Sequence, residues 1–305
     1  MKETNAIRIV MAVMLAALVM LAPAEAAEPA PRVHIVTASP FGTSTNAYLV
    51  ETSQGVIAID SAPRLSDAKA LAVRIDSLGK PLLAVIITHG HPDHYAGVAT
   101  LVAGRGEIPI LATEQVAQDI AKNDADRAPL WKARYKDEWP DVRVLPNRTV
   151  RDGETIAIGG IRFTVRALGP GESNADWYWR IDADGGHAFI GDVVMANGHA
   201  YALDGHTAEW LRTLERLQRE LAGVRHIHPG HGPSGGPELL RWEHDYIAAY
   251  RYEVDALSGG KNSLDEQAKK SLTENMKARY PGLPLEFLIG LGANAVAREL
   301  AGESL

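Results

Sequence analysis

Hydrophobic residues in the first part of the chain recur at two different periods. Residues 65–79 carry leucine, alanine and isoleucine at helical spacing and end at a glycine, which predicts a helix. The continuous apolar run LLAVIITH at residues 82–89 predicts a strand that is covered on both faces. Before them, short apolar segments bounded by turn residues predict strands at residues 33–39, 46–53 and 55–62.

Strand and helix patterns continue along the rest of the chain. A helix and a short strand (108–113) are expected after residue 89, whereas residues 126–147, which contain Trp131, Tyr135 and Trp139, are expected to be irregular. Residues 207–221 predict a strong amphipathic helix, and residues 236–305 are mostly helical in pattern. Further strands are predicted at residues 154–159, 161–167, 177–182, 187–192 and 224–232. This order indicates an α/β (α+β) chain in which two sheets pack together beneath helices.

The N-terminal segment has the pattern of a targeting signal. Lys2 and Arg8 precede the apolar run IVMAVMLAALVMLAP, and small residues around Ala26 follow it. A basic start, an apolar stretch that is short for a bilayer span and a small-residue cleavage motif are typical of a secretory signal peptide. We therefore expect removal of residues 1–26 and a periplasmic or secreted protein without stable membrane association. An uncleaved membrane anchor is the alternative.

The composition of the chain limits which metal ligands and which partners it can use. The chain contains no cysteine, so any metal site must use histidine, aspartate, glutamate and water. Its formal net charge of −7 argues against a nucleic-acid partner, which would require a basic face. We expect a small-molecule substrate, and the sequence leaves open whether the chain forms a homo-oligomer.

The densest group of candidate functional residues follows the apolar run that ends at Ile87. Residues 88–97 read THGHPDHYAG, so that His89, His91, Asp93 and His94 lie within six positions. The proline between them favours the first turn of a helix, and a strand-to-helix loop can present all four side chains to one small volume. Imidazole and carboxylate groups together suit a divalent cation. A polar loop with surface histidines is the simpler alternative, but it does not account for the position after a buried strand.

The motif His89-x-His91-x-Asp93-His94 resembles the signature of the metallo-β-lactamase superfamily. Later positions match that family in the expected order: Asp60 as the acidic residue that supports the histidine loop, GPGES at 169–173 as the segment of the third ligand, Asp192 as the bridging aspartate, and His231 as the last histidine. The resemblance implies a four-layer αββα sandwich with a helical C-terminal segment. Residues 27–235 would form the catalytic core, and residues 236–305 a helical part of the same domain.

Glu172 departs from the family pattern, which usually has histidine at this position. The resemblance implies a first site of His89, His91 and Glu172, a second of Asp93, His94 and His231, and Asp192 between them. We expect two divalent metal ions, zinc first, with iron or manganese as alternatives because a carboxylate makes the first site harder. The other interpretation is that the first site is weak and Glu172 acts as a base or hydrogen-bond partner.

The resemblance implies a hydrolase in which metal-activated hydroxide attacks a carbonyl ester, lactone or lactam of a small molecule, and the signal-peptide pattern adds that this hydrolase is exported. Asp93 is the candidate catalytic residue, because it could orient the nucleophile and pass a proton to the leaving atom. His199, Tyr201 and Trp131 are candidate substrate contacts. A phosphodiesterase that uses the same two metals, and a non-catalytic binding protein with an altered first site, are the alternatives. The remaining histidines, including His187, His226 and His228, are expected to be packed or solvated.

Overall fold

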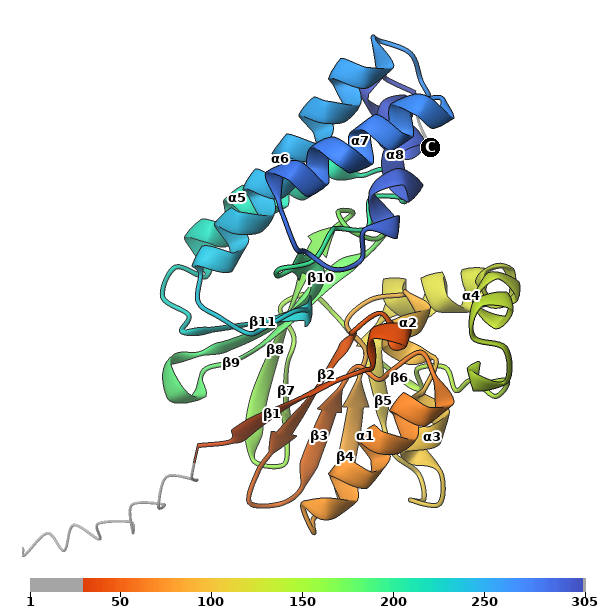
Figure 1. The fold of residues 1–305 in the computed structure, drawn as a ribbon. Coiled ribbons are helices and arrows are strands. Elements are labelled where there is room, and N and C mark those ends of the chain that lie inside the picture. Colours follow the sequence, from red (N-terminus) through yellow and green to blue (C-terminus); the bar gives the residue numbers. More distant parts are fainter. Residues whose placement is uncertain (1–29, 304–305) are drawn as a thin grey trace, which may run out of the picture.

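Two β-sheets form the centre of the molecule (Figure 1). The structure is a computed structural model that describes residues 30–303. The predicted signal peptide, residues 1–26, lies outside the described residues. The first sheet has the order β1 (Arg32–Thr37), β2 (Asn46–Glu51), β3 (Val56–Ile59), β4 (Leu82–Ile86), β5 (Ile110–Thr113), β6 (Arg148–Val150). The second has the order β11 (His226–His231), β10 (His187–Met195), β9 (Asp176–Ile181), β8 (Ile161–Gly169), β7 (Thr155–Ile158).

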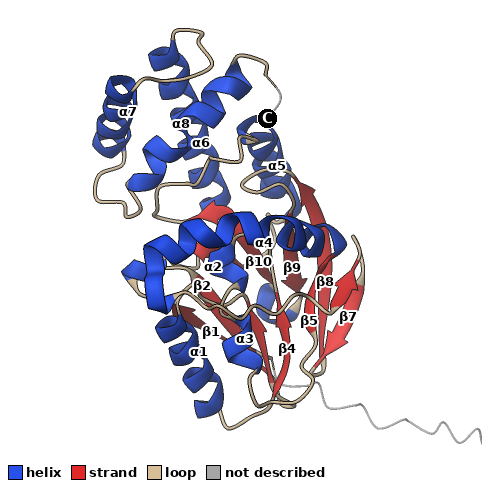
Figure 2. Cartoon of the chain, turned by 90° about the vertical axis from the view of Figure 1, so that its right-hand side faces the viewer, coloured by secondary structure: helices blue, strands red, loops and turns tan. Residues whose placement is uncertain are grey.

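Helices cover the outer faces of the two sheets (Figures 1 and 2). On the side of the first sheet these are α1 (Leu65–Ser77), α3 (Val98–Val102) and α4 (Glu114–Tyr135), and the short α2 (Pro92–Tyr95) lies at the edge of this sheet. On the side of the second sheet they are α5 (Thr207–Glu220), α6 (Glu238–Ser258), α7 (Glu266–Arg279) and α8 (Phe287–Leu300). The arrangement confirms the predicted α/β class and the helix–sheet–sheet–helix layering.

The main core lies where the inner faces of the two sheets meet. Leu49 and Ile57 of the first sheet are fully buried in one hydrophobic cluster with Phe163 and Trp179 of the second. A second cluster joins the outer face of β10 to helices α5 to α8, with Trp210 and Tyr250 fully or almost fully buried. Burial of side chains of this size contributes about 1.5–3 kcal/mol each. The two clusters hold β10 from both sides, which fixes the position of Asp192 within it.

Parallel pairing brings the polar ends of several strands to one edge. Strands β3, β4 and β5 pair in parallel, and β10 pairs in parallel with β11. Asp60 therefore follows β3 beside the loop that follows β4, and His231 ends β11 close to Asp192. Because the carboxyl ends of parallel strands share an edge, residues far apart in sequence can form one site there.

One sequence prediction is wrong in part. Residues 126–135, expected to be irregular, continue helix α4, and irregular structure begins only after Glu138. Pro129 lies inside the helix and interrupts its pattern, which hides the helical spacing of the aromatic residues. Trp131 and Tyr135 are four residues apart on one helix face, and their rings stack with centroids 5.5 Å apart.

The C-terminal part is helical, as its pattern predicts. Helices α6, α7 and α8 pack against one another and, through α6, against β10 (Figure 1). The assignment of residues 27–235 and 236–305 to one domain stays a prediction. Within residues 30–303, no helix combines the length and apolar character needed to cross a membrane.

Candidate metal centre

Side chains from the loops and strand ends described above meet in one buried volume. All seven residues predicted from the sequence as metal ligands are there, and none is more than 7% exposed. Their ligand-type atoms fall into two groups, each within 4.8 Å: His89, His91, Glu172 and Asp192 in one, and Asp93, His94, Asp192 and His231 in the other. Asp192 belongs to both groups, as expected of a bridging residue.

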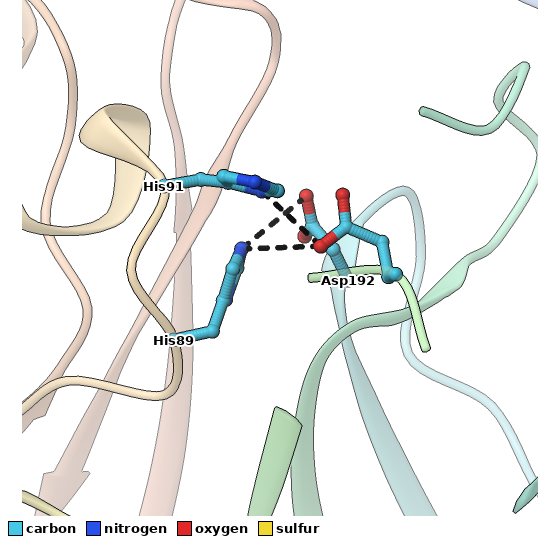
Figure 3. A group of neighbouring side chains, drawn as sticks. His89, His91 and Asp192 are labelled. Atoms are coloured by element: carbon cyan, nitrogen blue, oxygen red, sulfur yellow. Dashed lines mark ion pairs between the residues drawn. The ribbon is translucent and has the colours of Figure 1, made fainter. Parts of the chain in front are cut away.

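The distances fit atoms that face a common centre rather than direct hydrogen bonds. In the first group, Glu172 Oε2 lies 3.2 Å from His91 Nδ1 and 3.6 Å from His89 Nε2. Asp192 faces these histidines from β10 of the second sheet, with its Oδ2 3.9 Å from His89 Nε2 (Figure 3). In the second group, Asp192 Oδ1 lies 3.2 Å from His94 Nε2, and Asp192 Oδ2 lies 3.2 Å from His231 Nε2.

Asp60 fixes two of the histidines. Its carboxylate accepts hydrogen bonds from the Thr88 amide (2.8 Å) and hydroxyl (2.7 Å) and lies 2.9 Å from His94 Nδ1. Since the Thr88 hydroxyl donates to Asp60, its oxygen is left to accept from His89 Nδ1 at 3.0 Å. Both rings then carry their proton on Nδ1 and present a lone pair at Nε2 to the site. Asp60 itself has a left-handed backbone, with φ 62°, a conformation often retained at functional sites.

The last histidine and Asp93 are held by a loop that sequence reasoning missed. His231 Nδ1 donates to the Thr43 carbonyl at 2.9 Å, which again leaves Nε2 free for the site. Asp93 Oδ2 accepts from the hydroxyls of Thr45 (2.9 Å) and Thr43 (3.2 Å). Burial opposes ionisation of Asp93, but His94 and His231 outweigh it and hold its pKa below the usual range. Nothing in the sequence near either threonine signals this role.

His91 is anchored by a second acidic residue that the sequence did not identify. Its Nε2 lies 3.4 Å from Asp204 Oδ2, so Nδ1 is the atom presented to Glu172. Arg127 stands beside this pair, 3.9 Å from Asp204, and its guanidinium donates to the Gly90 carbonyl at 2.6 Å. The only sequence signal for Asp204 was its position a few residues after His199 and Tyr201, the two candidate substrate contacts.

Glu172 is the most isolated ligand candidate. Its backbone amide donates to Asp176 Oδ2 at 2.7 Å, which fixes the loop, yet neither carboxylate oxygen has a hydrogen-bond partner among the described residues. Burial raises the pKa of Glu172 to about 8, although His91 opposes the shift. A buried carboxylate without hydrogen bonds is costly unless a cation compensates its charge.

The unpaired atoms indicate what the centre is built to hold. His89 Nε2, His94 Nε2, both oxygens of Glu172 and Asp192 Oδ1 are buried without a hydrogen-bond partner in residues 30–303. Each such atom costs about 1–3 kcal/mol when nothing satisfies it. Imidazole nitrogens that present lone pairs, combined with carboxylates and no thiolate, fit two divalent cations such as zinc, iron or manganese. The ligand assignment is therefore consistent with the geometry.

The backbone of β11 requires a glycine beside Asp192, the residue that belongs to both ligand groups. A Cβ atom at Gly230 would lie 1.7 Å from Asp192 Oδ1. The Pro-Gly pair in HPGHG thus has a packing role in addition to turning the chain, because the two strands approach closely where both ligand groups meet.

A pocket of about 550 Å³ opens above the centre. His91, Asp93, Glu172, Asp192 and His231 form its floor. Its walls come from α4, the loop of residues 196–206, and the start of α8, and they are largely apolar: Leu130, Trp131, Met195, Leu203, Leu285, Phe287, Leu288 and Leu291. Pockets of this size, with few polar groups at one end, are typical of sites for small organic ligands.

The three predicted substrate contacts have different positions. Trp131 and Tyr201 line the pocket, as a substrate contact would require. His199 does not: it is fully buried behind the wall, and its Nδ1 lies 2.9 Å from the Tyr246 hydroxyl. The expectation that His199 touches a substrate is therefore corrected to a packing role. It failed because sequence proximity to the site does not specify which way a loop side chain points.

Comparisons with known proteins agree with this geometry. A family model described as the metallo-beta-lactamase superfamily matches residues 40–231, which include every predicted ligand. The chain belongs to the metallo-beta-lactamase superfamily. It is accordingly a metallo-hydrolase of that fold.

Similar proteins include both fungal and animal members. The chain is 30% identical over 262 residues to the lactamase-like protein nscB of Trichophyton rubrum, covering 80% of this chain and 69% of that protein. It is 29% identical over 242 residues to the acyl-coenzyme A thioesterase MBLAC2 of Gallus gallus, covering 68% and 79%. A solved metallo-beta-lactamase from Pontibacter korlensis superposes with a TM-score of 0.59 at 22% identity, covering 72% and 95% of the two chains, which supports the fold alone.

Proposed function

We propose that the protein is an exported metal-dependent hydrolase that cleaves a carboxylic ester or thioester with an apolar acyl group. The observation that carries this proposal is the apolar pocket placed directly over the two ligand groups. Lactones and lactams share the same electrophilic carbonyl and are the comparison substrates. Export rests on the N-terminal pattern of residues 1–26 and stays part of the proposal.

The pocket mouth is unusually apolar for a surface that faces water. Leu130 is 70% exposed, Phe287 47% and Leu291 45%, and all three line the same opening. Each methylene of an acyl chain that is buried against such side chains contributes about 0.8 kcal/mol. This favours substrates with an extended or aromatic acyl group over acetyl compounds.

A cationic side chain at the rim favours an anionic leaving group. The Arg134 guanidinium lies 4.8 Å from the centre of the Phe287 ring and makes no ion pair within residues 30–303. Arg127, by contrast, is already held by Asp119 at 3.0 Å. The Gallus gallus relative is named an acyl-coenzyme A thioesterase, and coenzyme A is an anionic leaving group. Thioesters are therefore our first choice of substrate.

Divalent ions in the two ligand groups would supply a water molecule that is deprotonated near neutral pH and a Lewis acid for the carbonyl. Asp93 lies on the pocket floor with Oδ2 held by Thr43 and Thr45, where its carboxylate can orient the attacking water and pass a proton to the leaving atom. The apolar walls exclude bulk water from this step. Zinc is our first choice of metal, with iron or manganese as alternatives for the group that contains Glu172.

Substrate profiling of the metal-loaded protein tests the proposal. We expect turnover of chromogenic esters and thioesters, with kcat/KM rising with acyl length, and slower turnover of lactones, β-lactams and bis-nitrophenyl phosphate. Hydrolysis of the phosphodiester or the β-lactam in the absence of ester and thioester turnover would overturn it.

A charge reversal tests the leaving-group interaction separately. Arg134→Glu should raise KM for an anionic thioester by about fivefold and leave a neutral ester nearly unchanged, since exposed charge pairs contribute about 0.2–1 kcal/mol. Arg219→Glu makes the same change on an exposed face of α5 away from the pocket and is the matched control. Equal effects of both variants would remove Arg134 from the binding surface.

A further inference from the structure

A second set of metal-ligand side chains lies at the opposite ends of β10 and β11. Asp184 belongs to a 3-10 turn (Ala183–Gly185), while His187 and His226 begin the two strands. One ligand-type atom from each residue lies within 4.8 Å of the others. Five positions along β10 separate His187 from Asp192, so this group lies up to roughly 16 Å along the strand from the candidate metal centre.

His187 lies at the end of a short hydrogen-bonded chain of side chains. His187 Nδ1 lies 2.9 Å from His228 Nε2, and His228 Nδ1 lies 2.8 Å from the Ser234 hydroxyl. If His228 Nδ1–H donates to Ser234, His228 Nε2 accepts the proton of His187 Nδ1, and a lone pair remains at His187 Nε2. That nitrogen has no hydrogen-bond partner in the described part of the chain, although His187 is only 5% exposed. A buried nitrogen of this kind requires a partner, either a hydrogen-bonding group or a cation.

His226 and Asp184 complete the group. The imidazole rings of His187 and His226 stack with centroids 4.4 Å apart and an interplanar angle of 20°, so their faces lie against each other, and binding of one shared ion requires the partly exposed His226 ring to turn. His226 Nε2 is also buried without a hydrogen-bond partner within residues 30–303, and it lies 3.8 Å from Asp184 Oδ2. Arg225 approaches the other oxygen of Asp184, Oδ1, at 3.5 Å, which leaves Oδ2 for the group.

The environment keeps the buried histidines in the form that binds metals. Burial lowers the pKa of His187 to about 4 and that of His228 to about 3, with the neighbouring histidines acting in the same direction. Both rings are therefore neutral at pH 7, as a metal ligand must be. Packing against Phe189 accounts for part of the stack, but it does not satisfy the two free nitrogens.

We propose that Asp184, His187 and His226 form a third divalent-cation site, distinct from the hydrolytic centre. Two imidazole nitrogens and one carboxylate oxygen, with solvent in the remaining position, suit Zn²⁺ or a similar borderline cation. A bound ion would link the turn between β9 and β10 to the start of β11. Its role would be to stabilise this end of the second sheet, because a ligand that binds only the folded state stabilises it.

Metal counting on matched variants tests the site. Tag-free, full-length protein is dialysed to equilibrium against micromolar Zn²⁺, and zinc per chain is measured for wild type, Asp184→Asn and His226→Ala. These two residues are partly or fully exposed, so their replacement should preserve the fold. We expect both variants to bind one ion fewer than wild type, with unchanged hydrolytic turnover.

His244→Ala is the matched control. His244 also lies near carboxylates, at 3.3 Å from Asp245 and 3.7 Å from Glu215, but belongs to none of the metal-ligand groups of the described residues. It should retain the wild-type zinc content. Equal zinc in all four proteins, or the same loss in His244→Ala, would overturn the proposal. The difference of one ion is independent of how many ions the hydrolytic centre holds, so its failure is distinguishable from failure of the proposed function.

Anomalous diffraction supplies a second measurement. Crystals of the wild-type protein soaked in Zn²⁺ should give a peak between Asp184, His187 and His226. Absence of that peak at a concentration that fills the hydrolytic centre would contradict the assignment even if the dialysis counts differed.

Discussion

Replacement of Glu172 by glutamine is the most informative perturbation of the metal centre. The change keeps the size of the side chain, which is 1% exposed, and removes the negative charge that Glu172 would carry as a metal ligand. Glu172 Oε2 faces His91 Nδ1 at 3.2 Å and His89 Nε2 at 3.6 Å, which makes it the third ligand atom of the first group. The Glu172 amide hydrogen bond to Asp176 involves the backbone and is retained.

The expected loss of metal affinity can be bounded by comparison with residues that hydrogen-bond to a metal ligand without binding the metal themselves. Removal of a residue that only orients a ligand typically lowers metal affinity about 10–100-fold. Loss of an anionic side chain that binds the metal directly should lower metal affinity by at least the upper end of this range, about 100-fold or about 2.7 kcal/mol. A glutamine oxygen still ligates weakly, so Glu172→Gln should release one ion at limiting metal and keep the other.

The assay combines elemental analysis with competition against a chromogenic chelator, and kcat is measured at each metal loading. Glu243→Gln is the matched control, because Glu243 is also fully buried and accepts a hydrogen bond from the Met195 amide at 2.8 Å without belonging to either ligand group. Burial raises the pKa of Glu243 well above its usual value, so the neutral glutamine resembles its native form. Two tightly bound ions in both variants would refute the assignment of Glu172 as a ligand.

Three further outcomes are expected. Asp204→Asn replaces the carboxylate that anchors His91 by a neutral amide. It should lower the affinity of the protein for one metal ion about 10–100-fold in the same titration, and unchanged affinity would contradict the anchoring role. Gly230→Ala should displace the Asp192 carboxylate, because the added Cβ would lie 1.7 Å from its Oδ1. We expect lower metal content and a lower melting temperature, and wild-type values of both would show that β10 and β11 can move apart without cost. The metal-free protein should melt at a lower temperature at pH 9 than at pH 7. The folded chain raises the pKa of Glu172 to about 8 and of His231 to about 10, so folding takes up protons that the unfolded chain largely lacks, and this uptake becomes less favourable as the pH rises; an equal or higher melting temperature at pH 9 would disagree.

The sequence by itself predicted the class of the fold and the ligand set. Hydrophobic patterns are local properties, and the strands within residues 46–62 and 82–89 are visible as apolar runs because they are buried on both faces. The histidine loop was visible because a metal site requires several ligands, and His89, His91, Asp93 and His94 lie within six residues. Glu172 was found only because the family resemblance indicated where to look.

Tertiary structure decided the partners that hold these ligands. Thr43, Asp176 and Asp204 are ordinary polar residues in sequence, and they become important only where chain folding brings their oxygens beside a histidine or a loop amide. The same holds for the burial of His199 and for the pocket wall that α4 and α8 form together, since both depend on contacts between segments more than 40 residues apart. Periodicity reports which face of an element is apolar. It carries no information about which distant element will cover that face, because packing between elements is set by the whole chain.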